Sequence, residues 1–220
     1  MAGPLRKPPA LTALMHAARE NDVQKIAALV QNKNADMTAT DELGRTALLQ
    51  ALEAGNEEAA LMLIFHGSDT GYARPPKNET PLIIACRKNM TQAIERLVTV
   101  KAPLDAQDND GNTGLMKALE NANGWAACRL VGAGADFDTL KNKKEESAWR
   151  LAHQHLDADD LAFFKEQVRQ RREYKAQKCA RELSENIKSA TILNHPLRPL
   201  KQLTLRKSPD PQPPPPKNAG

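Results

Sequence analysis

Apolar and polar positions alternate along this chain in a pattern that returns about every 34 residues. A second apolar segment follows each of the first four copies of the motif, at residues 26–30, 60–64, 93–98 and 127–131. A fixed period of this length, with several markers in register, indicates a repeat protein. The motif that opens each unit reads TALMHA from Thr12, TALLQA from Thr46, TPLIIA from Thr80, TGLMKA from Thr113 and SAWRLA from Ser147.

Each unit predicts two short helices. The Thr or Ser that opens the motif is a good N-cap, because its hydroxyl can accept a hydrogen bond from the first turn. Pro81 follows Thr80 at the first helical position, where its missing donor costs nothing. Neither helix can bury its apolar face alone, so the units must stack. Residues that tolerate a left-handed backbone follow the first helix at Asn21, Gly55 and Asn89, and the second at Asn34, Gly67 and Gly134.

This pattern resembles the ankyrin repeat over roughly residues 10–168. The resemblance implies an all-α solenoid of helix–turn–helix units, joined by short β-hairpin turns. The segments Asp41–Gly44 and Asp108–Gly111 match the hairpin tips of that family. The first unit lacks its leading hairpin, and the segment GYARPPKNE at 71–79 lacks the tip residues, so an irregular hairpin is expected there.

The fifth unit departs from the repeat, with Trp149 in place of Leu and Leu156 in place of Gly, as expected of a terminal repeat with one solvent face. Residues 157–193 predict one helix or two. Leu161, Phe164 and Val168 form a stripe expected to cap the stack. A second stripe, Cys179, Leu183 and Ile187, either folds back or serves a partner.

The sequence therefore divides into a flexible N-terminus (1–10), a repeat domain (11–168), a basic helical extension (169–193) and a disordered proline-rich tail (194–220). Charge supports this division. The chain carries +4 overall, whereas residues 165–207 hold twelve Lys or Arg against four Asp or Glu, or +8. Bulk charge thus does not favour nucleic-acid binding by the whole chain. A solvated basic helix is the expected role of residues 169–178.

No catalytic or metal chemistry emerges from the sequence. The three cysteines are widely spaced, Cys86 and Cys128 lie in apolar runs as core thiols, and no CxxC pair occurs. His153 and His155 are two residues apart and point in different directions on a helix. No phosphate-binding or nucleophile motif is present. We therefore expect a non-enzyme without cofactor or metal.

The N-terminal sequence has no apolar core of a signal peptide, and no run reaches the roughly 18 apolar residues of a membrane span. These observations predict a cytoplasmic monomer, with export as an effector or a nuclear location left open.

The resemblance implies a protein–protein interaction module or scaffold that binds through the concave face formed by hairpin tips and inner helices. The alternative is an adaptor, regulator or secreted effector, whose basic helix and proline-rich tail contact a second partner, nucleic acid or an anionic membrane. Carried over position by position, the family's contacts fall in the hairpins on Glu42, Leu43, Arg45, Arg74, Lys77, Glu79, Asn109, Asp110 and Asn112, and in the inner helices on Arg19, Glu20, Glu53, Arg87, Lys88 and Glu120.

Overall fold

The structure, a computed structural model, describes residues 12–31 and 35–192, with side chains as far as residue 185. The predicted flexible N-terminus and proline-rich tail, and Asn34, lie outside this part. The chain forms two compact units, residues 1–175 and 176–220. Within the described residues all regular structure is helical, apart from two isolated β-bridges. The predicted all-α class is confirmed.

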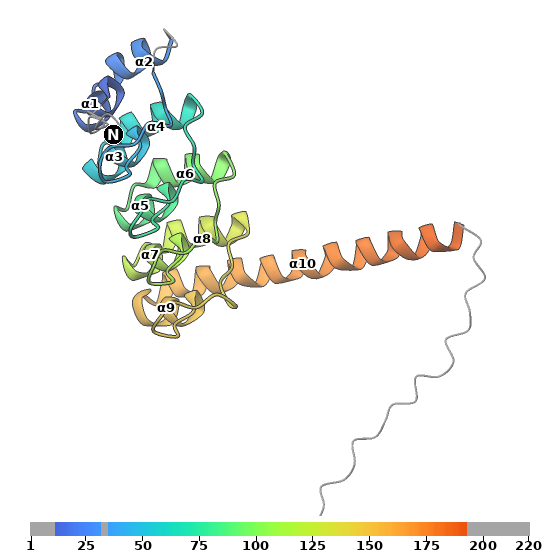
Figure 1. The fold of residues 1–220 in the computed structure, drawn as a ribbon. Coiled ribbons are helices and arrows are strands. Elements are labelled where there is room, and N and C mark those ends of the chain that lie inside the picture. Colours follow the sequence, from blue (N-terminus) through green and yellow to red (C-terminus); the bar gives the residue numbers. More distant parts are fainter. Residues whose placement is uncertain (1–11, 32–34, 193–220) are drawn as a thin grey trace, which may run out of the picture. The chain divides into compact units, whose positions relative to one another are not determined.

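The helices form successive antiparallel pairs along the stack. Inner helices contact the next inner helix, outer helices contact the next outer helix, and Figure 1 shows the two columns side by side. Helix α10 (Ala158–Ile192) follows the last inner helix and is a single helix, the first of the two predicted alternatives. The pairs are α1 (Ala13–Arg19) with α2 (Val23–Gln31), α3 (Ala47–Ala54) with α4 (Glu57–Phe65), α5 (Pro81–Arg87) with α6 (Thr91–Thr99), and α7 (Gly114–Glu120) with α8 (Gly124–Ala133), followed by the inner helix α9 (Ala148–His155).

The inner helices begin as the motif predicts. The hydroxyl of Thr80 accepts a hydrogen bond from the Ile83 amide at 3.4 Å, and the other four motif hydroxyls make the equivalent bond. The predicted left-handed residues are also found, since Asn21, Gly55, Gly67, Asn89 and Gly134 all have positive φ. Lys101 and Ala122 take the same left-handed conformation at the matching ends of α6 and α7, although neither residue type predicts it.

The core lies between neighbouring units. Leu82 is fully buried and lies so close to α7 that a Cβ on Gly114 would approach its Cγ to 3.1 Å. Burial raises the pKa of the Cys86 thiol strongly, and burial together with the charge of Asp160 raises the pKa of Cys128 to about 11. Both thiols are therefore protonated core groups at neutral pH, as predicted, whereas Cys179 is exposed.

The first part of α10 closes the end of the stack. Phe164 and Val168 are buried, with Phe164 6.3 Å from the ring of Trp149, so the predicted cap is confirmed. Arg172 extends this contact, because its guanidinium lies 5.8 Å from the Trp149 ring centre and 3.0 Å from a carboxylate oxygen of Asp138. In the second predicted stripe, Cys179 and Leu183 are exposed.

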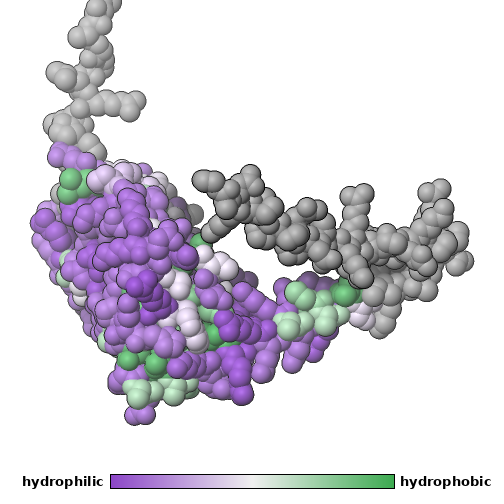
Figure 2. Space-filling model, turned by 90° about the horizontal axis from the view of Figure 1, so that it is seen from below, coloured by the Kyte–Doolittle hydropathy of each residue, from purple (hydrophilic) through white to green (hydrophobic). Residues whose placement is uncertain are grey.

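The surface is mostly polar. On the face seen in Figure 2, hydrophobic residues form only small separate patches among hydrophilic ones. In the described part of the chain, no helix has both the length and the apolar character needed to cross a bilayer. No group of three or more His, Cys, Asp or Glu side chains suited to a metal ion occurs among the described residues.

Candidate protein-interaction surface

The hairpin tips are shaped by one side-chain oxygen each. In the second unit, Asp41 Oδ1 accepts hydrogen bonds from the amides of Leu43 and Arg45 at 3.0 and 2.8 Å. Asp108 does the same in the fourth unit. In the fifth unit Asn142 takes this role, with bonds of 3.0 Å from the amides two and four residues later. Its tip is thus regular, although the sequence does not show the family's tip residues there.

The third hairpin is irregular, as predicted, and both of its neighbours brace it. The amide of Asn109 in the next hairpin donates to the Lys77 carbonyl at 2.9 Å. On the other side, the Tyr72 hydroxyl donates to the Gly44 carbonyl at 3.0 Å. These two hydrogen bonds hold residues 71–79 against both neighbouring hairpins, although the usual tip is missing.

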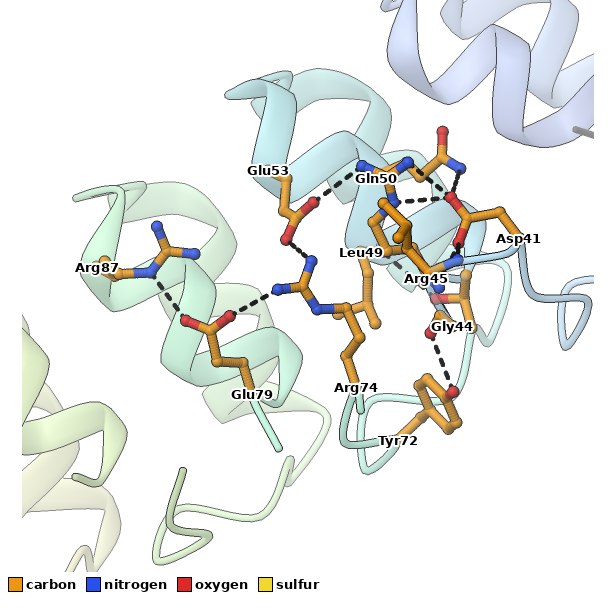
Figure 3. A network of polar contacts seen from close by, with 12 residues as sticks. Asp41, Gly44, Arg45, Leu49, Gln50, Glu53, Tyr72, Arg74, Glu79 and Arg87 are labelled. Atoms are coloured by element: carbon orange, nitrogen blue, oxygen red, sulfur yellow. Dashed lines mark hydrogen bonds and ion pairs between the residues drawn. The ribbon is translucent and has the colours of Figure 1, made fainter. Parts of the chain in front are cut away.

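An ion-pair ladder crosses the inner face of the second and third units (Figure 3). Its three cations alternate with three carboxylates, so the ladder is neutral as a whole. The central rung is Arg74, whose side chain is 12% exposed and bridges two carboxylates. In order, the ladder consists of Asp41, Arg45, Glu53, Arg74, Glu79 and Arg87, with pairs of 2.7, 3.3, 3.1 and 3.1 Å in addition to the Arg74–Glu53 pair.

The first two groups of the ladder, Asp41 and Arg45, are stabilised in their charged forms. Burial alone would raise the pKa of Asp41, but the amide and guanidinium of Arg45, together with the Leu43 amide, lower it overall. Burial likewise opposes the charged form of Arg45, whose pKa is nevertheless raised by Asp41 and Glu53. Both groups stay ionised at neutral pH.

The fifteen predicted contact residues therefore fall into different environments. Glu79 and Asn112 are only 5% exposed, and Asn112 accepts a hydrogen bond from Asn142 at 3.1 Å. Arg45, Glu53, Arg74 and Arg87 are committed to the ladder. The predicted residues that are exposed and outside the ladder are Arg19, Glu20, Glu42, Leu43, Lys77, Lys88, Asn109, Asp110 and Glu120.

Two adjoining cavities lie along the inner face from the third to the fifth unit, and the first is also lined by Glu79 and Arg87 at the end of the ladder. Their volumes are about 360 and 520 Å³, and both are lined by Asp110 and Lys117. We name this feature the inner trough. The first cavity also reaches Lys77, and the second reaches the fifth hairpin at Lys143 and Lys144.

The sequence prediction missed Lys143 and Lys144, although they are 34 positions after Asn109 and Asp110. Extending the repeat register into the fifth hairpin would have found them. Lys117 also lines the trough and pairs with Glu120 at 2.9 Å. Lys77, Lys143 and Lys144 make no ion pair with any described residue and form a basic rim, while the same lining also contains the carboxylates of Asp108, Asp110, Glu120 and Glu146.

The family model for ankyrin repeats (three copies) matches two overlapping segments, residues 4–74 and 66–141, which together span more than half of the chain. The chain belongs to the ankyrin-repeat family. This family is generally a non-catalytic protein-interaction fold, and this ankyrin-repeat chain is a protein-interaction module.

Several similar proteins match part of this chain. The neurogenic locus notch homolog protein 1 of Xenopus tropicalis is 33% identical over 141 residues, which cover 64% of this chain and 6% of that protein. The Danio rerio protein of the same name is 34% identical over 113 residues, or 51% of this chain and 5% of its own length. Human neurogenic locus notch homolog protein 2 is 29% identical over 131 residues, which cover 60% of this chain and 5% of that protein. The ankyrin-repeat chain thus matches about one twentieth of each relative.

Proposed function

We propose that this ankyrin-repeat module works in the cytoplasm as a monomer and binds a protein partner in the inner trough. The observation that carries the proposal is the pair of cavities that share Asp110 and Lys117. The ladder next to them is neutral, and each of its charged groups is already ion-paired. We therefore expect it to attract a charged partner only weakly. The trough combines concavity with three lysines that have no ion-pair partner in the described part of the chain.

The partner is expected to present acidic side chains to the trough. Lys77, Lys143 and Lys144 are exposed and lie on its rim. Of the carboxylates in the same lining, Glu79 and Glu120 are ion-paired, and Asp108 and Glu146 accept hydrogen bonds. Charges at an interface rim steer association and fix the register of the partner more than they add affinity. We therefore expect binding that weakens with rising salt.

The test begins with a photo-reactive amino acid placed at Glu120 in the trough, and separately at Lys25 on α2 as a control. The protein crosslinked only from Glu120 is identified and purified. Its Kd is then measured for the wild type and for Lys143→Glu/Lys144→Glu. We expect at least about tenfold weaker binding by the variant, because two attractive rim contacts become repulsive.

The matched control is Lys25→Glu/Lys101→Glu, which reverses two exposed lysines outside the trough. The Kd of this control should stay within about twofold of the wild-type value, since charges distant from a contact contribute little to binding. Equal crosslinking from both positions, or an equal loss of affinity in both double variants, would refute the trough as the binding site.

A second candidate function is that of an adaptor, in which α10 contacts another protein. Every described side chain from Arg172 to Glu185 is exposed, and Leu183 is 62% exposed. A helical segment whose described side chains are all exposed gains little from packing, so a partner would stabilise it. Lys175→Glu/Lys178→Glu should abolish capture of that protein and leave trough binding intact. Capture of nucleic acid instead, with a steep salt dependence, would assign α10 to phosphate binding.

A further inference from the structure

A shallow groove lies on the outer helices, away from the inner trough. This groove of about 460 Å³ follows the exposed side of α6, including Gln92 and Arg96. Leu61 of α4 lines one side and Trp125 of α8 the other. We name this feature the outer groove, and it shares no lining residue with the inner trough.

Exposed aromatic side chains lie in the outer groove, at Trp125, and beside it, at Phe65. Trp125 is 46% exposed, and Phe65, at the end of α4, is 68% exposed. The guanidinium of Arg96 lies over the Phe65 ring, 5.6 Å from its centre. Tryptophan and arginine are the residues that most often dominate binding at protein interfaces. Their presence together on an open groove indicates a contact surface rather than solvated helix faces.

The charges around the outer groove indicate what it attracts. Both carboxylate oxygens of Glu95 bind Arg129, at 2.7 and 2.8 Å. Glu57 Oε1 accepts the amides at the start of α6, from Gln92 at 2.8 Å and Ala93 at 3.0 Å. These two carboxylates are thus engaged, whereas Arg96 makes no ion pair with any residue that the structure describes.

We propose that the outer groove binds a segment of a second protein that carries an acidic side chain beside a bulky apolar one. The carboxylate pairs with Arg96, and the apolar side chain packs between Trp125 and Leu61. Charge complementarity selects this occupant, because Arg96 is the charged side chain of the groove that has no counter-charge among the described residues. Binding here is independent of the inner trough, so the ankyrin-repeat chain can hold two proteins at once.

The test uses the full chain, immobilised, and a displayed library of random 16-residue peptides. We expect enriched peptides to place Asp or Glu within one helical turn of Leu, Phe or Trp. For one such peptide, Arg96→Glu and Trp125→Ala should each weaken binding at least about tenfold, the size of a typical hot-spot loss. Changing the peptide's acidic residue to Lys should restore binding to Arg96→Glu but not to Trp125→Ala.

Matched controls are Arg150→Glu and Phe163→Ala, which alter an exposed arginine and an exposed phenylalanine elsewhere. Both should bind the peptide as the wild type does, and melts of all four variants show whether each is folded. The proposal is overturned if the enriched peptides lack a carboxylate, or if the charge swap fails to restore binding. It is also overturned if Lys143→Glu/Lys144→Glu removes peptide binding. A wild-type dimer in sedimentation that Trp125→Ala dissociates would assign the groove to a second copy instead.

Discussion

At the scale of single residues, a few side chains each stabilise one turn by accepting hydrogen bonds from its backbone amides. Asp41 is the clearest case. One of its oxygens closes the hairpin tip through two amides, and the other binds the side chains of Arg45 and Gln50. A buried carboxylate with this many donors is stable only in its charged form.

We therefore predict an acid-dependent loss of stability that depends on Asp41. Its pKa is lowered in the folded state, so its contribution is present above the unfolded value of about 3.9 and is lost as pH falls through the folded value. The melting temperature of the wild type should drop more steeply below about pH 4 than that of Asp41→Asn. Asp110→Asn, at an exposed position of the fourth tip, is the control and should follow the wild type. Parallel curves for wild type and Asp41→Asn would contradict this assignment.

A second residue-scale prediction concerns the contact of Leu82 with Gly114. Leu82→Ala should cost about 2–5 kcal/mol, because it leaves a cavity between two units. Gly114→Ala should also destabilise, since its Cβ would lie 3.1 Å from Leu82 Cγ. In the Leu82→Ala background that crowding is gone, so urea unfolding of all four proteins should give a coupling of at least about 0.5 kcal/mol. Additive costs would show that the two positions relax independently.

At the scale of the elements, neighbouring units are joined by side chains that cross from one to the next. The ladder joins the second hairpin, α3, the third hairpin and α5. The side-chain amide of Asn121, at the end of α7, also joins two units. It donates hydrogen bonds to the last two carbonyls of α5 at 3.0 Å. Such contacts make the stability of one unit depend on the next.

We predict that the central rung matters more than the last one. Arg74→Met leaves the carboxylates of Glu53 and Glu79 without their shared cation and should cost about 1–3 kcal/mol. Arg87→Met removes a cation that is 38% exposed and should cost less than about 1 kcal/mol. Chemical unfolding measures both values. Equal costs would mean that solvent screens the whole ladder.

At the scale of the whole molecule, the end of the stack needs a cover. Phe164 and Val168 supply it, and Arg171 and Arg172 add contacts beyond residue 168, where the sequence places a domain boundary. A Cβ on Gly134 would lie 2.5 Å from Arg171, so that side chain rests directly on the backbone at the end of α8.

We predict a graded series of truncations. A chain ending at residue 175 should melt close to the full chain, because it keeps these contacts. One ending at 168 should melt lower by a few degrees, since it loses the Arg172 pair and ring contacts. One ending at 156 exposes the apolar end of the last unit and should aggregate. A soluble, fully stable 1–156 chain would show that α10 does not cap the stack.

The sequence by itself determined the features that depend on short spacings along the chain. The Thr and Ser caps and the left-handed residues follow from chemistry within three or four residues of each position, and the period of about 34 residues is visible because these local signals recur in register. The capping stripe of Leu161, Phe164 and Val168 is equally local, because helical spacing alone aligns it. Phe163, which lies outside this stripe, is 56% exposed.

Only the tertiary structure decided which charged residues are available to a partner. Glu79 and Glu120 are both acidic residues predicted as contacts, yet Glu79 is 5% exposed and pairs with Arg74 and Arg87, whereas Glu120 is exposed. The difference arises from side chains in adjoining units, which no local pattern records. The outer groove has the same origin, because Leu61, Arg96 and Trp125 come from three different units and meet only when the helices stack.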